Sequence, residues 1–285
     1  MSKKKVLVFG SSGMLGSYFS NLLEKKYKEK GYEVIRNDKA DGGVDITDQG
    51  QVNEAIHESN ANYVVNCAAY TDVNGAEENP EIAFKVNADA PKYMALVCKE
   101  LNIPFIHIST DYVFGGNKED GYTEDYRKFN PLNKYGESKL QGEKNVLEVG
   151  GNNYIFRTSW LFGPGATNFI DKISKYAKEL PELKVVTDEI GCPTFVRDLS
   201  EGILLALEGE IDLGIYHVCS RDSLSRYEFA ENILKLQGIE TPIKEAKLDD
   251  FPRKAQVPHT SILLNTKLDE ARTSNEMLEE YFNIV

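Results

Sequence analysis

Tyr135 and Lys139 are four residues apart, a spacing that places both side chains on one face of a helix. Reduction of a ketone puts negative charge on its oxygen, so the reaction needs a proton donor and a hydrogen-bond partner. A phenol with an ordinary pKa of about 10 becomes a better acid beside an ammonium group, which stabilises the phenolate. We therefore predict Tyr135 as general acid, Lys139 as the group that lowers the tyrosine pKa, and Thr110 as the hydroxyl that orients the carbonyl oxygen.

A glycine-containing loop, Gly10-Ser11-Ser12-Gly13-Met14-Leu15-Gly16, joins an apolar run to a helical pattern. Glycines at such a junction permit a tight turn, a close approach to a pyrophosphate, and close packing of helix on strand. The helix N-terminus adds free N–H groups and a positive dipole end for the phosphates. We predict dinucleotide binding at Gly10, Ser12, Gly13, Met14, Leu15 and Gly16, with Lys139 also binding the nicotinamide ribose.

The segment Arg36-Asn37-Asp38-Lys39 ends the second predicted strand. An acid at this place accepts hydrogen bonds from a ribose 2′-OH, whereas an arginine accommodates a 2′-phosphate. Asp38 has the right separation from the glycines for NADH, but Arg36 and Lys39 suit NADPH, so the choice between the cofactors stays open. Asp45 and Ile46 precede the next helix, where we expect them near the adenine.

Apolar β-rich runs alternate with helical patterns along the chain. We predict strands at 6–9, 33–36, 63–66, 104–109, 154–157, 184–186 and 215–218, and helices at 15–23, 48–58, 81–101 and 229–236. The helix containing Tyr135 is expected to begin with Asn130 as cap and Pro131 in its first turn. This alternation predicts an α/β fold with a doubly wound parallel sheet covered by helices on both faces.

In open parallel sheets, ligands bind outside the carboxyl ends of the strands. Thr110 follows the strand at 104–109, so it should face the same crevice as the glycine loop. We assign residues 1–158 to a dinucleotide-binding domain, to which later sheet elements from about 170–190 and 212–238 return. Residues 159–285 form an interleaved smaller lobe in this prediction.

The composition of the chain disfavours several classes of binding partner. The 285 residues include 45 acidic and 33 basic ones, a formal charge of -12 that disfavours nucleic acid and anionic membranes as partners. The four cysteines and four histidines show no metal-ligand spacing, so we expect reduced thiols in a cytoplasmic protein and no metal. The apolar run at 6–9 is too short for a signal peptide, and no stretch approaches a membrane span.

Seven segments in this order resemble one known family. They are Gly10 to Gly16, Asn66-Cys67-Ala68-Ala69, Ser109-Thr110-Asp111-Tyr112-Val113-Phe114, Pro131-Leu132-Asn133, Tyr135-Gly136-Glu137-Ser138-Lys139, Arg157-Thr158-Ser159-Trp160 and Asp188-Glu189-Ile190-Gly191-Cys192-Pro193-Thr194. With them the chain resembles the extended short-chain dehydrogenase/reductase family, and within it the dTDP-4-dehydrorhamnose reductases.

The resemblance implies a Rossmann-like domain, a C-terminal substrate-binding lobe, and reduction of the C4 keto group of a nucleotide-linked deoxysugar by NADPH or NADH. It implies the catalytic triad Thr110, Tyr135 and Lys139. The implied cofactor-binding residues beyond the glycine loop are Asp38, Asp45, Ile46, Ala68, Ala69, Tyr70 and Asn87, and the implied substrate-binding residues are Asp111, Tyr112 and Trp160. The expected partner is a nucleotide-sugar substrate, and a homodimer is compatible with the resemblance.

Two details of the sequence refine the resemblance. Related 4,6-dehydratases have Asp-Glu after the threonine, whereas here Tyr112 follows Asp111, which disfavours dehydration. Reductases of this group commonly have an Arg-Pro segment near the C-terminal lobe, where this chain has Gln256-Val257-Pro258 with Arg253 and Lys254 upstream. The means of holding the substrate diphosphate is therefore open.

Two alternatives remain beside the reductase. The regulatory β subunit of methionine adenosyltransferase is similar to these reductases and shares the Ser/Thr-Asp-Tyr-Val-Phe run, which would make the protein non-catalytic. A related sugar-nucleotide epimerase is the other alternative, and it would retain NAD tightly through its cycle.

Overall fold

A parallel sheet lies at the centre of the computed structural model, which describes residues 3–269 and 271–284. Among these residues the sheet has six strands in the order β10-β5-β4-β3-β1-β2, and every neighbouring pair is parallel. The strands are β1 (Lys4–Phe9), β2 (Tyr32–Asn37), β3 (Tyr63–Asn66), β4 (Phe105–Thr110), β5 (Asn153–Thr158) and β10 (Gly214–His217). The predicted α/β fold with a Rossmann-like parallel sheet is confirmed.

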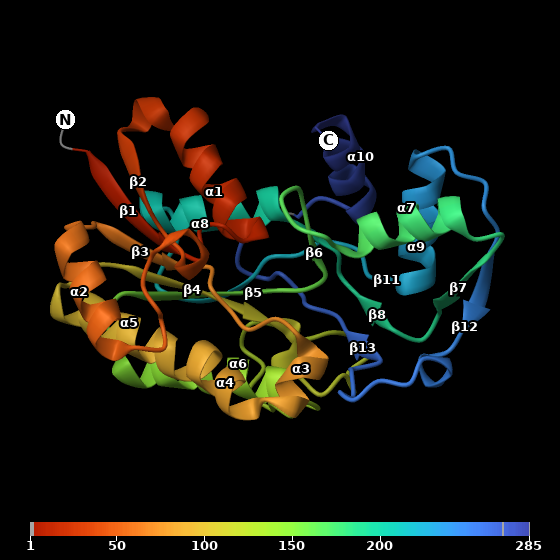
Figure 1. The fold of residues 1–285 in the computed structure, drawn as a ribbon, viewed down its shortest axis with the longest axis horizontal. Helices are drawn as coiled ribbons and strands as arrows, with labels where there is room; N and C mark the ends of the chain where they lie inside the picture. Colours follow the sequence, from red (N-terminus) through yellow and green to blue (C-terminus); the bar gives the residue numbers. More distant parts are fainter. Residues whose placement is uncertain (1–2, 270, 285) are drawn as a thin grey trace.

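Helices cover both faces of this sheet (Figure 1). One face packs on α1 (Met14–Lys25) and α8 (Val196–Glu208), and the other on α2 (Gln49–Ser59), α5 (Ala90–Glu100) and α6 (Lys134–Val149). The side chains of β1 alternate between the two layers, so Val6 and Val8 join one core cluster while Leu7 and Phe9 join the other. A strand buried on both faces must be apolar throughout, which explains the continuous hydrophobic run that predicted it.

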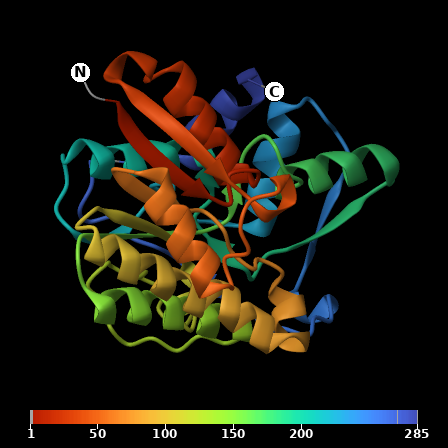
Figure 2. The same cartoon turned by 60° about the vertical axis from the view of Figure 1, so that its left-hand side comes forward.

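A smaller lobe lies beyond the ends of the central strands (Figures 1 and 2). Its helices α7 (Phe169–Glu179) and α9 (Arg226–Leu236) pack together, and α9 also packs on β7 (Leu183–Val186), β11 (Leu224–Ser225) and β12 (Ile243–Ala246). The remaining short elements are α3 (Val73–Glu78), β6 (Leu161–Phe162), β8 (Ile190–Gly191), β9 (Thr194–Phe195), β13 (Thr260–Ser261), and the single turns η1 (Lys28–Lys30), η2 (Lys39–Asp41), η4 (Asp111–Val113) and η5 (Leu248–Asp250).

The prediction that residues 170–190 return to the central sheet is wrong. Instead, β7 pairs with β12 in a separate two-stranded sheet, and β10 is the strand beside β5 at the edge of the central sheet. Within 212–238, β10 joins the central sheet, whereas β11 pairs with β8 in the lobe. The boundary at residue 158 stays a prediction, and residues 1–2, 270 and 285 of the two predicted units lie outside the described residues.

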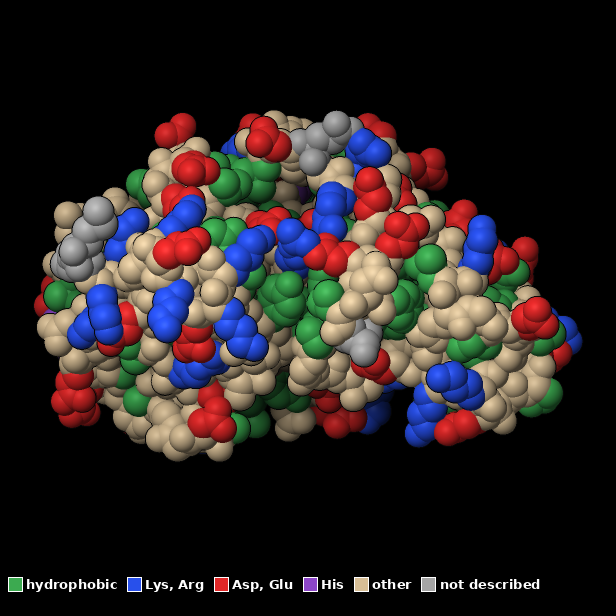
Figure 3. All heavy atoms as spheres, turned by 90° about the horizontal axis from the view of Figure 1, so that it is seen from above, with side chains coloured by type: hydrophobic (Ala, Val, Ile, Leu, Met, Phe, Trp, Pro, Cys, Tyr) green, Lys and Arg blue, Asp and Glu red, His purple; other side chains and the backbone are tan. Residues whose placement is uncertain are grey.

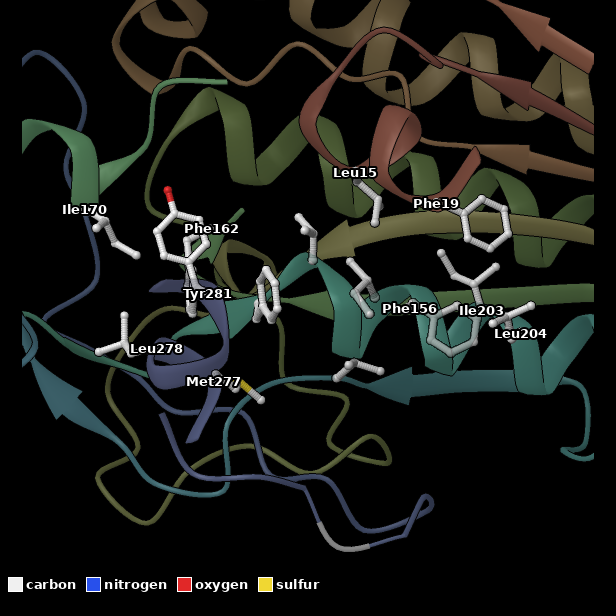
Figure 4. Packing of buried hydrophobic residues seen from close by; sticks show 14 of the residues in the cluster. Leu15, Phe19, Phe156, Phe162, Ile170, Ile203, Leu204, Met277, Leu278 and Tyr281 are labelled. Atoms are coloured by element: carbon white, nitrogen blue, oxygen red, sulfur yellow. The ribbon is translucent and has the colours of Figure 1, made fainter. Parts of the chain in front are cut away.

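The sheet and the lobe share one hydrophobic core (Figure 4). Phe19 of α1, Phe156 of β5 and Ile203 of α8 belong to the same buried cluster as Phe162 of β6 and Tyr281 of α10 (Ser274–Ile284). Because buried side chains pack closely, this shared cluster fixes the lobe relative to the sheet. The wall that the lobe contributes to the site is therefore held against the strand ends.

Two helices differ in detail from the sequence prediction. The helix α6 begins at Lys134 with Asn133 as its cap, since the Asn133 side chain accepts a hydrogen bond from Gly136 N at 2.8 Å, so the predicted start at Asn130 and Pro131 is wrong. The long helix predicted at 81–101 is divided into α4 (Pro80–Phe84), a π-helical turn η3 (Lys85–Asp89) and α5. The π turn contains Asn87, which is fully buried.

The surface seen from above intersperses acidic and basic side chains without a field of one sign (Figure 3). Hydrophobic side chains reach this surface between the charged groups. None of the helices in the described part of the chain is both long and apolar enough to cross a bilayer.

Candidate active site

A cavity of about 800 Å³ lies where the glycine loop, the carboxyl end of β4, the start of α6 and the lobe meet. Most of the predicted site residues line it, namely Gly10, Ser12, Gly13, Met14, Leu15, Asp38, Ile46, Ala68, Ala69, Thr110, Asp111, Tyr112, Tyr135, Lys139 and Trp160. Asp45 lines an adjoining cavity of about 290 Å³, to which Gly10, Asp38, Ile46 and Ala68 also contribute. Gly16, Tyr70 and Asn87 lie behind these walls and line neither cavity.

The glycine loop has the close packing that a dinucleotide site requires. Gly10 has φ +73°, and a Cβ there would lie 2.5 Å from the backbone nitrogen of Ala68. A Cβ on Gly16 would overlap the carbonyl oxygen of Gly10, so its role is to let α1 pack close to the loop. Gly13 is the N-cap residue of α1, and the first turn of this helix has no acidic residue. Its N–H groups and dipole therefore suit a phosphate, and the residues present fit a dinucleotide.

Asp38 occupies the place where a ribose is expected. Its carboxylate accepts hydrogen bonds from Ser12 N at 3.2 Å and Ala40 N at 3.0 Å. Partial burial opposes ionisation, but these hydrogen bonds prevail and lower the pKa of Asp38. The side chain therefore stays anionic beside the glycine loop.

The two basic residues near Asp38 have other partners. Arg36 pairs with Glu24 of α1 at 2.9 Å, and Lys39 pairs with Asp45 at 2.5 Å. The hydrogen bond from Lys39, with those from Thr47, lowers the pKa of Asp45 to about 2. Of the residues weighed for cofactor choice, Asp38 thus faces the cavity as a carboxylate, while both cations are held by acids.

The three proposed catalytic groups meet at the carboxyl end of β4. Thr110 ends this strand, and its hydroxyl donates to Asp111 Oδ1 at 2.9 Å, beside the Tyr135 hydroxyl whose pKa it influences. Lys139 lies one turn beyond Tyr135 on α6, and its Nζ donates to the Ile108 carbonyl oxygen at 2.6 Å. The crevice that the sequence predicted for Thr110 is the one lined by the glycine loop.

The net pKa of Tyr135 is raised in this structure, whereas the sequence predicted a tyrosine pKa lowered by Lys139. Burial raises the pKa of Tyr135 to about 12, and the hydrogen bond with Thr110 only partly offsets this. Burial also lowers the pKa of Lys139 to about 8, against the opposing charge of Glu143. Desolvation is the largest influence on both groups, so Tyr135 is kept in its protonated form.

Asn87 and Tyr70 shape the cavity wall from behind. The Asn87 amide accepts from Tyr70 N at 2.9 Å and donates to Tyr70 O and to Ser138 Oγ, both at 3.0 Å. These bonds fasten the segment after β3, which includes Ala68 and Ala69, to the helix that contains Tyr135. Asn87 therefore positions the residues that line the cavity and does not line it itself.

Below the cavity floor, Glu143 and Arg157 form a fully buried ion pair. Arg157 donates to Glu143 from Nη2 at 2.6 Å and from Nε at 2.8 Å, and Ser109 Oγ donates to the same carboxylate at 2.5 Å. The pair joins β4, β5 and α6, the three elements that position Thr110 and Tyr135.

The predicted substrate residues form the lobe side of the cavity. Asp111 is buried, and its Oδ2 accepts a hydrogen bond from Ser261 Oγ at 2.5 Å, which connects η4 to β13. Burial raises the pKa of Asp111 to about 6, although the hydrogen bonds from Ser261 and Thr110 oppose the shift. Tyr112 packs edge-on to Tyr135 with ring centroids 5.7 Å apart, and burial raises its pKa as well.

Arg226 also lines the cavity, and sequence reasoning missed it. Its guanidinium lies 3.5 Å from the centre of the Trp160 ring. Ser225 and Glu228 form a capping box at the start of α9, but nothing in the local sequence indicates where the side chain of Arg226, the first residue of that helix, points. Its place depends on the pairing of β11 with β8, between residues more than thirty positions apart.

No group of three or more metal-ligating side chains occurs in residues 3–269 and 271–284. The adjacent acids Glu77 and Glu78 have other partners: Glu77 accepts a hydrogen bond from Lys134 N at 2.7 Å, and Glu78 pairs with Lys254. The four cysteines are free thiols.

Comparison with known proteins places these features in one family. The family model described as the RmlD substrate binding domain matches residues 4–281. The spore coat polysaccharide biosynthesis protein SpsK of Bacillus subtilis is 36% identical over 97% of this chain and 96% of its own length.

Two solved structures of dTDP-4-dehydrorhamnose reductases are similar over their full length. The one from Clostridium acetobutylicum is 35% identical, with a TM-score of 0.92 over 98% of this chain and 99% of its own. The one from Bacillus anthracis, in complex with NADP, is 31% identical, with a TM-score of 0.92 over 99% of this chain and 100% of its own. The chain therefore belongs to the RmlD substrate binding domain family.

Proposed function

We propose that this protein is an NAD(P)H-dependent oxidoreductase that reduces the C4 keto group of dTDP-4-dehydrorhamnose to give dTDP-rhamnose. One observation supports it above the others. Thr110, Tyr135 and Lys139 line one cavity together with the glycine loop. A proton donor therefore lies in the same space as a fitting dinucleotide site, which is the arrangement that carbonyl reduction needs. The relatives named as reductases of this substrate support the choice of sugar.

In the proposed mechanism Tyr135 acts as general acid. The reduced dinucleotide, when bound, supplies a hydride to the carbonyl carbon. Tyr135 gives its hydroxyl proton to the carbonyl oxygen as that oxygen gains negative charge, which leaves a secondary alcohol and a phenolate. Because burial raises the pKa of Tyr135 to about 12, the proton stays on the ring until the carbonyl oxygen becomes the stronger base.

Thr110 and Lys139 support this transfer. Thr110 lines the cavity beside Tyr135, and its hydroxyl, which donates to Asp111 Oδ1 in this structure, is the group we assign to orient the substrate oxygen. Lys139, with its pKa lowered to about 8, is mostly cationic at pH 7 and stabilises the phenolate from one helical turn away. Its bond to the Ile108 carbonyl holds the ammonium against the end of β4.

The experiment mixes the protein with dTDP-4-dehydrorhamnose and NADPH or NADH, and follows the absorbance of the reduced nicotinamide. We expect the absorbance to fall with at least one cofactor, and the product to have a new hydroxyl of a single configuration at C4. No oxidation of either cofactor would refute the proposal.

A pair of variants tests the assignment of the acid. Tyr135→Phe should lower kcat by roughly 10²–10⁴-fold, the usual contribution of a positioned general acid, while NADP⁺ binding is retained. Tyr176 on α7 is 47% exposed, so Tyr176→Phe is the matched control and should keep the parent kcat.

The reductase explains the family membership better than the two alternatives. The relatives reported with an activity in their names are reductases, which favours neither a regulatory subunit nor an epimerase. A homodimer and a cytoplasmic location stay predictions.

A further inference from the structure

The cavity wall has two cationic side chains among the described residues that line it, Lys139 and Arg226. Lys139 lies at the strand ends with the proposed proton donor, and burial lowers its pKa. Arg226 lies on the lobe side. In Figure 1, the short strands β8, β11 and β13 separate the central strand ends from α7 and α9, and Arg226 directly follows β11.

Several contacts fix the Arg226 guanidinium in one orientation. It stacks on Trp160, with Cζ 3.5 Å from the ring centre, and lies 5.1 Å from the centre of the Phe169 ring. Its Nε and Nη2 both contact Glu189 Oε1 at 2.9 Å, and its backbone N–H donates to the Glu189 carbonyl at 3.0 Å. Glu189 is contacted by Nε and Nη2 of the guanidinium, so Nη1 is the nitrogen that can donate to a ligand. Its side chain keeps 17% of its surface exposed.

The charge of this cluster remains positive. Glu189 is buried and has a second guanidinium, that of Arg253, 3.6 Å from its Oε2. Two arginines on one carboxylate leave a net charge of +1. The charge acts inside the cavity, since Arg226 is among the groups that influence the titration of buried Asp111 and Tyr112. A planar guanidinium held on an aromatic ring is well suited to bind phosphate oxygens.

We propose that Arg226, held by Glu189 and Trp160, binds the diphosphate of the nucleotide-sugar substrate and so selects nucleoside diphosphates. The inference rests on the proposed function. The glycine loop at the other end of the cavity suits the pyrophosphate of the dinucleotide, so a second diphosphate needs its own counter-charge on the lobe side. The chain has Gln256-Val257-Pro258 where an Arg-Pro segment was expected, and Arg226 supplies a guanidinium from a different element.

The test compares the affinities of the intact protein for dTDP and for thymidine, measured by calorimetry or by competition. The Kd for thymidine divided by the Kd for dTDP isolates the contribution of the phosphates, because damage to the nucleoside site weakens the binding of both ligands equally. Arg226→Gln should lower this ratio at least tenfold. Arg197→Gln is the matched control, since Arg197 also pairs with a glutamate, Glu201 at 3.0 Å, but does not line the cavity, and it should change the ratio less than twofold.

A variant with the opposite effect guards against simple loss of folding. Glu189→Gln removes the negative charge of the cluster and keeps a hydrogen-bond acceptor for Arg226, so it should raise the ratio. The Kd for NADP⁺ should be unchanged in all three variants, which separates the substrate diphosphate from the phosphates of the cofactor.

Failure of the inference and failure of the proposed function give different results. An unchanged ratio in Arg226→Gln, or a ratio that does not rise in Glu189→Gln if the first variant does not fold, overturns the inference. Failure of the parent protein to prefer dTDP over thymidine overturns it as well. Turnover of the keto sugar with an unchanged ratio leaves the proposed function intact, whereas the predicted ratios without turnover refute the reductase and retain a nucleoside diphosphate site.

Discussion

Replacing Asp111 with asparagine removes one ionisable group from the interior beside Thr110. Burial raises the pKa of this carboxyl from 3.8 to about 6. One pKa unit corresponds to about 1.36 kcal/mol, so ionisation of Asp111 costs the folded state about 3 kcal/mol relative to the unfolded chain. Asparagine has no such cost, and its amide can accept from Thr110 and donate to Ser261 in place of the two carboxylate contacts.

The sign of the pH dependence follows from the raised pKa. Between about pH 4 and pH 6 the folded state binds more protons than the unfolded state, so the contribution of Asp111 is present at low pH and is lost as pH rises. In Asp111→Asn this loss disappears. The free energy of unfolding of the variant should therefore gain on the parent by about 2 kcal/mol between pH 4 and pH 7.

The assay is urea unfolding of both proteins at pH 4, 5, 6 and 7, with the difference in unfolding free energy plotted against pH. Titration of every other group is common to both proteins and cancels in the difference. Asp249 is exposed on η5, so Asp249→Asn is the matched control and its difference from the parent should stay flat. A flat difference for Asp111→Asn too would show that the buried carboxyl does not pay a desolvation cost, and the reasoning would fail.

Three further variants test the loop, the floor and the ribose site. Glu143→Gln should lower the free energy of unfolding by about 3–5 kcal/mol, because it leaves the buried Arg157 charge uncompensated. Urea unfolding measures this free energy, and a loss below about 1 kcal/mol would contradict the role of the pair. Gly16→Ala should lower Tm and abolish NADP⁺ binding, since the added Cβ overlaps the Gly10 carbonyl; an unchanged Tm by thermal unfolding would show that the loop can relax. Asp38→Ser should shift the ratio of kcat/KM for NADPH over NADH upward by about tenfold, because it removes a carboxylate that repels a 2′-phosphate; an unchanged ratio would place the ribose elsewhere.

Local spacing was enough to predict that the glycine loop, Thr110, Tyr135 and Lys139 line one cavity. The glycine loop follows an apolar strand, Thr110 ends another, and a helical turn separates Tyr135 from Lys139, so the rule for ligand sites in parallel sheets brings them to one edge. The parallel sheet followed from its alternating apolar and helical segments for the same reason. These features depend on the order of elements and not on the details of packing.

Features set by long-range contacts could not be predicted in this way. The protonation of Tyr135 depends on how completely the folded chain excludes water, which the Tyr–Lys spacing does not contain. The strand β7 has the apolar composition of a central strand, but its partner is β12, more than fifty residues later in the chain. Arg226 reaches the cavity because β11 pairs with β8. The sequence around Arg226 does not specify this long-range pairing.

The continuous core between sheet and lobe limits how the enzyme can be re-engineered. Phe162 stacks on Phe195 at 5.5 Å and meets Tyr281 of the last helix edge-on at 5.7 Å, so a cut after β5 would divide one aromatic cluster. Grafting a foreign lobe onto this Rossmann half would expose these rings and invite aggregation. New sugar preferences are better sought by exchanging individual wall residues such as Trp160 than by recombining whole modules.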